Sequence, residues 1–310
     1  MQHIGEIYAI VVAVLWTATA LLSEAGVKRL GVLRMNIIRM FLALIFLSLT
    51  LYFTTGSPLP IYADTTTWFW LSISGFVGYV FGDICLFRSY VVIGSRFGQL
   101  FMTLSPLAAA FSCWLLLGEV PTLQALFGIF ITIVGIAMSI LKRADSENSS
   151  HFKLPIKGIF YGIGAGLGQG IGLTLSKIGM MRYSDVVPPE LTNVRAVIPF
   201  SATFIRAIFG LAGFLVLLSI NKGWGGLRDG LSDRRGLMFA ILASVFGPFI
   251  GVALSLKSVQ LADAGVAATL MALTPVIIIL PSWLINRQKI TKLEIVGAIV
   301  SVVGVALFFI

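Results

Sequence analysis

Long apolar runs separated by short polar segments make up almost the whole chain. The hydrocarbon core of a bilayer is about 30 Å thick, and an α-helix of about 20 apolar residues crosses it. A window of this length predicts ten membrane-spanning helices, at residues 7–22, 35–53, 67–87, 97–117, 122–141, 156–176, 197–220, 236–256, 264–285 and 294–310. We therefore predict an all-α integral membrane protein with ten transmembrane helices.

The most hydrophilic stretch, KRADSENSSHFK at residues 142–153, has five predicted helices on either side. It divides the chain into a first five-helix unit at 1–141, a linker at 142–155 and a second five-helix unit at 156–310. An odd number of crossings makes the second unit enter the membrane from the opposite side to the first. The two units are therefore predicted to be inverted repeats, an arrangement that many secondary transporters share.

The two units also repeat in sequence. One offset of 169 residues, set by Pro106 and Pro275, holds from the third predicted helix to the end of the chain. At this offset the matched pairs are Gly78–Gly247, Gly82–Gly251, Arg88–Lys257, Ser89–Ser258, Met102–Met271, Trp114–Trp283, Gly128–Gly297 and Gly135–Gly304. At other offsets Arg39 matches Arg206, and SEAG at 23–26 resembles SKIG at 176–179. Matched glycines, prolines and cations are rarely accidental, so we infer a duplication.

Composition supports the membrane interpretation and excludes several functions. The chain is 58% hydrophobic and only 11% charged, whereas soluble domains are about 45–50% apolar and about 25% charged. The net charge of +9 does not indicate a nucleic-acid partner, because the basic residues lie in short loops. With Cys85 and Cys113 inside apolar runs and His3 far from His151 in the sequence, we expect no disulfide framework, no metal site and no cofactor.

The loops predict an orientation. With the four cations near predicted helix ends set aside, fifteen Lys and Arg residues fall on the side of the linker and three on the other. Cytoplasmic loops carry an excess of Lys and Arg, so we predict that the linker is cytoplasmic and both termini lie outside. We expect a multi-pass protein of the inner (plasma) membrane.

The stretch SPLAAAFSCWLLLGEVPTLQALFGIFITIVGIAMSI resembles the end of an EamA-type repeat of the drug/metabolite transporter superfamily. The residues that carry the resemblance are Pro106, Gly118, Glu119, Thr122, Gly128 and Gly135, together with Trp16 and Arg39 in the first two helices. The second copy departs from the pattern, with Arg287 and Gln288 in place of Gly-Glu, and many relatives have both termini in the cytoplasm. The resemblance implies a ten-helix secondary transporter with a central substrate cavity, and names no substrate.

Asp83 is predicted to be the only carboxylate well inside a membrane span. Such a group is costly in lipid and needs a partner or water. Arg88 lies on another face of the same predicted helix, and Arg39 from the second helix is an equal candidate. A structural ion pair and a substrate-binding or proton-coupling site both remain open.

Six further residues are candidates for a substrate cavity or for coupling. Arg39, Arg88, Arg206 and Lys257 either extend to the membrane interface or, as pairs matched across the repeat, attract an anionic group. Gln169 is a polar residue inside the glycine-rich stretch YGIGAGLGQGIG, and Trp16 belongs either to an interfacial belt or to a cavity wall.

Pro106 and Pro275 are predicted to kink their helices, because proline removes a backbone hydrogen bond and crowds the preceding turn. The kinks either serve packing or shape a cavity. Glycines at 162, 166 and 170 and at 164, 168 and 172 form two stripes that permit close helix packing or leave cavity space.

The favoured function is secondary transport of a small organic metabolite by alternating access, as an exporter or permease. The chain has no phosphate-binding loop with Lys-Ser/Thr, so we do not expect it to hydrolyse ATP. The alternatives are a membrane-embedded enzyme acting on a lipid or phosphorylated substrate, against which stands the lack of HExxH, GxSxG or paired intramembrane carboxylates, and a receptor or scaffold. The expected partners are a small-molecule substrate and the bilayer, with a homodimer left open.

Overall fold

The computed structural model describes residues 3–118, 120, 122–141, 154–261, 270–286 and 290–309, and among them it contains helices and no strand. The predicted linker lies largely outside these residues. The elements are α1 (Ile4–Leu30), α2 (Val32–Thr55), α3 (Thr65–Gly75), η1 (Phe76–Asp83), α4 (Ile84–Phe101), α5 (Leu104–Leu117), α6 (Leu123–Leu141), α7 (Ile156–Val186), α8 (Thr192–Ala196), α9 (Ile198–Ile220), α10 (Trp224–Ser232), α11 (Arg234–Ser244), η3 (Val245–Phe249), α12 (Ile250–Leu261), α14 (Thr274–Ile277), α15 (Ile279–Asn286) and α16 (Lys292–Phe309).

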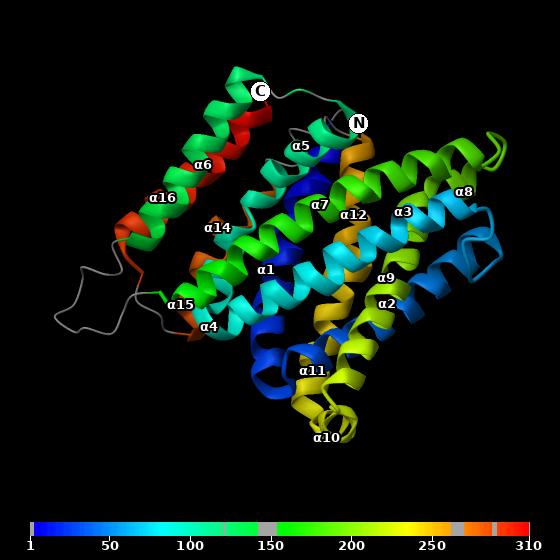
Figure 1. Cartoon of the computed structure of the whole chain (residues 1–310), viewed down its shortest axis with the longest axis horizontal. Helices are drawn as coiled ribbons and strands as arrows, with labels where there is room; N and C mark the ends of the chain where they lie inside the picture. The colour runs from blue at the N-terminus through cyan, green and yellow to red at the C-terminus, as the bar shows by residue number, and fades with distance from the viewer. Residues whose placement is uncertain are drawn as a thin grey trace.

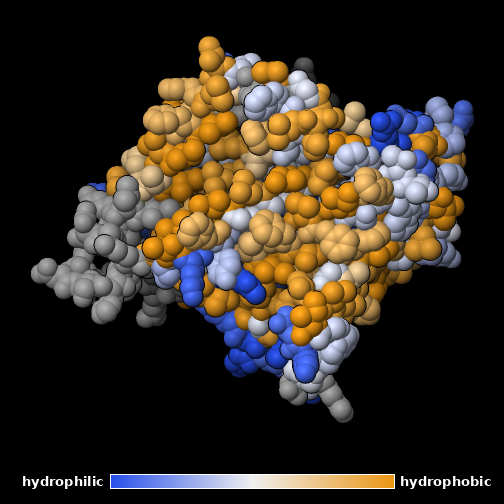
Figure 2. Space-filling view, in the orientation of Figure 1, coloured by the Kyte–Doolittle hydropathy of each residue, from blue (hydrophilic) through white to orange (hydrophobic). Residues whose placement is uncertain are grey.

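Several helices are long and apolar enough to cross a membrane. Five described segments meet that requirement, namely Ile4–Leu30, Val32–Thr55, Thr65–Phe101, Ile198–Ile220 and Arg234–Ser255. Shorter apolar helices cover Leu104–Leu117, Leu123–Ser139 and Thr274–Ile285. Figure 2 shows a broad apolar band on one face, with hydrophilic residues gathered at its lower edge and at its upper right. The prediction of an all-α multi-pass membrane protein is confirmed, and the count of ten spans stays a prediction.

The chain turns sharply inside Thr65–Phe101. Gly94 has φ 84° and ψ 160°, a conformation that favours glycine and that Gly31 repeats between α1 and α2. Gln99 Nε2 donates to Tyr90 Oη at 2.6 Å, although residues nine apart in an unbroken helix lie about 13.5 Å apart. The predicted third and fourth spans therefore meet at Gly94.

Helical hydrogen bonding is also interrupted just before two of the prolines. The chain makes a turn at residues 102–103, and α5 begins with Pro106 at its third residue. A matching turn at residues 272–273 precedes α14, where Pro275 is the second residue. The interruption and the proline thus recur at corresponding positions of the two halves.

Helices of the two halves pack reciprocally. The first helix of the first half, α1, packs against α11, α12 and α14 of the second half. The first helix of the second half, α7, packs against α3, η1, α4 and α5 of the first half. The remaining large contacts join α2 to α9 and α6 to α16, which lie side by side at one edge of the molecule (Figure 1). The first helix of each half therefore packs mainly within the other half.

The two glycine stripes of α7 allow the neighbouring helices to approach it closely. A Cβ atom at Gly166 would lie 2.8 Å from the Phe101 carbonyl oxygen, and Gly162 and Gly170 face α4 and α5 in the same way. On the other stripe, a Cβ atom at Gly168 would lie 2.8 Å from the Gly82 Cα atom. Both stripes serve helix packing, one against α4 and α5 and the other against η1 and Cys85 of α4.

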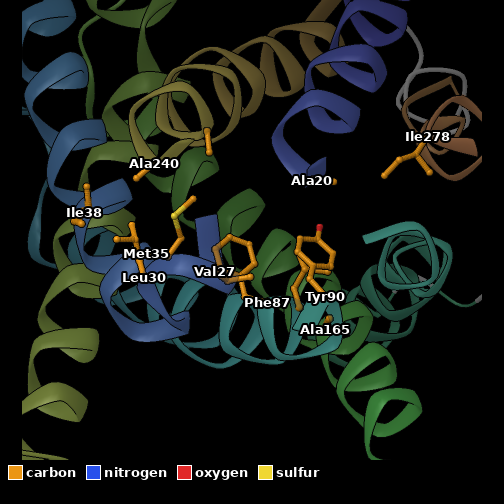
Figure 3. Close-up of a cluster of buried hydrophobic side chains, with 12 residues drawn as sticks. Ala20, Val27, Leu30, Met35, Ile38, Phe87, Tyr90, Ala165, Ala240 and Ile278 are labelled. Carbon is orange, nitrogen blue, oxygen red and sulfur yellow. The ribbon is translucent and has the colours of Figure 1, made fainter. Parts of the chain in front are cut away.

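The largest buried apolar cluster lies where α1, α2, α4, α7 and α11 meet. Phe87 and Tyr90 lie next to each other in it, with their ring centroids 5.6 Å apart (Figure 3). Val27 of α1 and Ala240 of α11 belong to the same cluster. This core contains residues from both halves, and it packs α2 and α4 against each other and against α1, α7 and α11.

Candidate functional site: a buried charge cluster between the halves

Asp83 joins three elements at the centre of the molecule. It is the last residue of η1, and only 4% of its surface is exposed. Arg39 of α2 donates from Nη1 to Oδ2 at 3.3 Å, and Gln169 of α7 donates from Nε2 to Oδ1 at 2.7 Å. Both carboxylate oxygens therefore have a donor, one from each half of the chain. Of the two partners considered for Asp83, the structure places Arg39 against it.

Arg39 is held on several sides. Its Nη1 also donates to Asn36 Oδ1 at 2.9 Å, and its guanidinium lies 4.6 Å from the centroid of the Phe87 ring. Its backbone oxygen accepts a hydrogen bond from Ser244 Oγ of α11 at 3.3 Å. Only 5% of Arg39 is exposed, so the alternative that this side chain extends to the membrane interface is wrong.

Arg206 of α9 is equally buried, at 5% exposed, and the interfacial alternative is wrong for it as well. Its guanidinium lies over the Tyr79 ring, 4.6 Å from the centroid. A Cβ atom at Gly78 would lie 2.9 Å from Arg206 Nη2, so glycine leaves room for the guanidinium. Gln169 Nε2 also donates to the Gly78 carbonyl at 3.1 Å, which brings Arg206, Gln169 and Asp83 together.

The backbone at this site is a π-helix in both halves. The segment η1 begins at Phe76 and η3 begins at Val245, which are 169 residues apart in the chain. Such π-helical insertions often occur at functional sites because they redirect the side chains that follow. Gly78 of η1 lies close to Arg206, and a Cβ atom at Gly247 of η3 would lie 3.6 Å from Arg39 Nη2, with Thr19 nearer.

Trp16 and Gln169 occupy corresponding places at the two π-helices. A Cβ atom at Gly82 would lie 3.2 Å from Gln169 Nε2, and one at Gly251 would lie 3.1 Å from Trp16 Nε1. Trp16 and Gln169 are separated by the same offset as SEAG and SKIG. Gly82 and Gly251 are separated by the same offset as the two prolines. Trp16 is half-buried and lies against Gly251 of α12, directly after η3.

Arg88 and Lys257 lie outside the charge cluster. Arg88 is exposed, and its guanidinium lies 5.5 Å from the centroid of the Tyr161 ring, with Nη1 3.4 Å from the Tyr161 hydroxyl. Lys257 is half-buried on α12 and makes no contact with the cluster among those the structure describes. Pro106 and Pro275 belong to the helix interruptions and not to this cluster.

Three buried charges differ from the sequence predictions. Glu24 and Glu294 are buried as well as Asp83, at 4% and 5% exposed, although the sequence places them at the ends of predicted spans and not well inside one. Arg96, one of the fifteen linker-side cations because it lies between the third and fourth predicted helices, is 4% exposed, and its Nε lies 2.7 Å from Glu294 Oε1. Glu24 Oε2 accepts from the Ser95 backbone N–H at 2.9 Å, directly after the turn at Gly94. A search for apolar runs treats each charge by itself, so it does not detect such pairs.

The ends of the assembly carry ordinary capping aspartates. Asp64 accepts from the Thr67 backbone N–H at 2.9 Å at the start of α3, and this bonding with Thr67 lowers the pKa of the Asp64 carboxyl. Asp233 caps α11, and Arg29 of α1 donates to its two oxygens at 2.7 and 3.0 Å. The hydrogen bonds from Arg29 lower the pKa of the Asp233 carboxyl below its usual range.

The fold and this cluster define a class of protein. It is a multi-pass helical membrane protein whose two halves interlock around a small set of buried, hydrogen-bonded charges. Intramembrane ionisable residues of this kind mark substrate and ion pathways more often than they serve packing alone. A family model for the EamA-like transporter family matches residues 3–141 and 156–310, so the chain belongs to that family.

Similarity to individual proteins agrees with this assignment. An uncharacterized membrane protein of Saccharomyces cerevisiae is 31% identical over 148 residues, which cover 44% of this chain and 35% of that protein. The matched region thus spans about a third of the length of this curated relative. One crystal structure superposes with a TM-score of 0.60 over 99% of this chain and 96% of its own, at 13% identity. At that identity the likeness concerns the fold alone.

Proposed function

We propose that this protein is a secondary transporter, an exporter or permease that carries a small organic solute through the membrane by alternating access. In this proposal residues 1–141 and 156–310 are inverted five-helix repeats, and residues 142–155 are the cytoplasmic linker. The solute binds at the cluster of Arg39, Asp83, Gln169 and Arg206. Membership of a transporter family supports the class, and the geometry supports the mechanism and the place of the site.

The reciprocal packing of α1 and α7 is the observation that carries the proposal. Each of these helices packs on the third and fourth helical segments of the other half, and the pairs α2–α9 and α6–α16 join corresponding helices. Two inverted halves that interlock in this way have two related arrangements, one open to each side of the membrane. Signalling or scaffolding needs no such equivalence.

The place of the cluster fits this mechanism. Asp83 and Arg39 belong to the first half, whereas Gln169 and Arg206 belong to the second, so a solute bound among them contacts both halves. Rocking of one half against the other then exposes the same side chains to the opposite side. The π-helical segments and the interruptions before Pro106 and Pro275 supply backbone that can adjust near the site.

Transport is tested with purified protein in liposomes. Preloaded vesicles are exposed to labelled members of a metabolite extract, and counterflow is expected for at least one solute, without ATP. Asp83→Asn should abolish this counterflow, and Arg88→Gln, a cation outside the cluster, should leave it unchanged. Chemical conversion of an added lipid or phosphorylated compound, with no counterflow, would instead favour a membrane-embedded enzyme.

The proposed orientation has a separate test. Both ends of the chain lie at the same end of the molecule in Figure 1, as an even number of crossings requires. The excess of Lys and Arg on the linker side supports a cytoplasmic position for that side. A reporter that is active only outside the cytoplasm should be active when fused to the C-terminus, and a reporter that is active only in the cytoplasm should not. Activity of the cytoplasmic reporter would reverse the proposed orientation.

A further inference from the structure

The central cluster carries more positive than negative charge. Arg39 and Arg206 are both 5% exposed, and Asp83 is the one carboxylate that the structure places in contact with either of them among the described residues. Two guanidinium groups and one carboxylate leave a formal charge of +1 at the centre of a membrane protein. An uncompensated buried charge is strongly unfavourable, so a site of this kind favours a counter-anion.

The repeat shows which arginine lacks its counterion. Arg39 and Arg206 adjoin corresponding glycines, Gly247 and Gly78, and therefore hold equivalent places in the two halves. Asp83 pairs with Arg39, but the residue 169 positions after Asp83 is Val252. Valine provides no charge, so the second half has no carboxylate at the position where the first half has one.

Two donors at Arg206 have no acceptor within the described part of the chain. The Nε atom of Arg206 and the hydroxyl of Tyr79 are both buried without a hydrogen-bond partner there. The two side chains are in contact, with the Arg206 guanidinium 4.6 Å from the centroid of the Tyr79 ring. Leaving buried donors unpaired is unfavourable, and an oxyanion that accepts from both would relieve this cost.

We propose that Arg206 and the Tyr79 hydroxyl bind the carboxylate of a small monoanionic organic solute. This inference rests on the proposed transport function and specifies the substrate class of the same site. A carboxylate brings one negative charge and balances the cluster, whereas a phosphate monoester brings about −1.5 to −2 and leaves an excess. A zwitterion is disfavoured, because it brings no net charge and leaves the excess positive charge of the cluster uncompensated.

Binding is measured without transport, by thermal unfolding of the purified protein in detergent. The probes are the sodium salts of monocarboxylates graded from acetate to benzoate, with phenyl phosphate, benzylamine and phenylalanine as compounds of matched size. We expect saturable stabilisation by one or more of the monocarboxylates. We expect weaker stabilisation by phenyl phosphate and none by benzylamine or phenylalanine beyond the effect of equal ionic strength.

Variants locate the effect. Arg206→Gln should weaken the apparent affinity for the stabilising carboxylate by about tenfold or more, as expected for the loss of a charge-assisted contact. Tyr79→Phe keeps the ring and removes only the hydroxyl, so it should weaken affinity by a few-fold while the unliganded protein still folds. Arg206→Lys keeps the charge and should bind better than Arg206→Gln. Arg88→Gln is the control and should bind as the unmodified protein does.

The outcomes separate this inference from the transport proposal. Carboxylate-specific stabilisation that Arg206→Gln and Tyr79→Phe weaken supports the anion site, even if the same carboxylate shows no counterflow in liposomes. Counterflow of a neutral or cationic solute that survives Arg206→Gln would support transport and overturn the anion site. Equal stabilisation by all probes, no stabilisation by any monocarboxylate, or stabilisation insensitive to Arg206→Gln would also overturn it.

Discussion

The ion pair between Arg96 and Glu294 provides a quantitative test of the described packing. It joins α4 of the first half to α16 of the second, and the two side chains are 4% and 6% exposed. Their charged atoms approach to 2.7 Å. Glu294→Gln keeps the size of the side chain and removes the negative charge, so the positive charge of Arg96 is left in a buried place.

Removing one partner of a buried ion pair costs about 3–5 kcal/mol. The lower value applies here, because the Arg96 guanidinium also lies 5.1 Å from the centroid of the Phe97 ring, a contact that survives the substitution. Large chains lose about 2 °C of melting temperature per kcal/mol, so Glu294→Gln should unfold about 6 °C lower. Replacing both residues together, as Arg96→Met with Glu294→Leu, should recover much of the loss because neither charge is then buried.

The assay is thermal unfolding of detergent-purified protein, followed by tryptophan fluorescence and by the monodisperse fraction after heating. Glu6→Gln is the control, because Glu6 pairs with His3 at a site where the two side chains are 33% and 74% exposed. Such surface pairs contribute little. A Glu294→Gln protein that melts within about 1 °C of the unmodified protein would refute the buried pairing.

Three further predictions concern packing, the central site and pH. Gly135→Val places a side chain against the Ser301 backbone where α6 meets α16, so it should destabilise the protein by about 1–3 kcal/mol in the same assay, whereas Gly225→Ala, with open space around it, should not. Asp83→Asn should abolish solute counterflow while membrane expression is retained, and normal counterflow would exclude Asp83 from the mechanism. Asp233 has a pKa below its ordinary range in the folded state, so its stabilising contribution is complete above the unfolded value of about 3.9 and is lost as pH falls through the folded value. Asp233→Asn should therefore flatten the fall in melting temperature below about pH 4, and an unchanged acid profile would contradict the assignment.

Much of the architecture could be predicted because it depends on features that repeat along the sequence. The family and the all-α membrane class follow from apolar runs and from residues such as Pro106 and Gly135. The offset between the prolines also relates Phe76 to Val245, where the two π-helical segments begin. Periodic and duplicated features can be recognised in the sequence alone, because a feature found in one copy can be compared with the same position in the other.

The pairing of charges could not be predicted in the same way. Asp83 lies closer in sequence to Arg88 than to Arg39, yet the helix presents it toward α2 and its partner is Arg39. Arg96 lies between two predicted spans and therefore counts as a loop cation, although the structure buries it against Glu294 of α16. Which charges meet depends on the rotation of each helix about its axis, and tertiary packing alone determines that rotation.

The difference between Asp83 and Val252 has an energetic consequence for the empty protein. If the two halves were identical, exchanging their conformations would turn the molecule over and leave its free energy unchanged, so inward-open and outward-open forms would be equally populated. Here only the first half carries a carboxylate at this position, and Gln169 of the second half corresponds to Trp16 of the first. In the proposed mechanism the two forms therefore differ in free energy, and the unloaded protein is preferentially open to one side. Under that proposal, the preference arises from the same substitutions that make the two halves unequal.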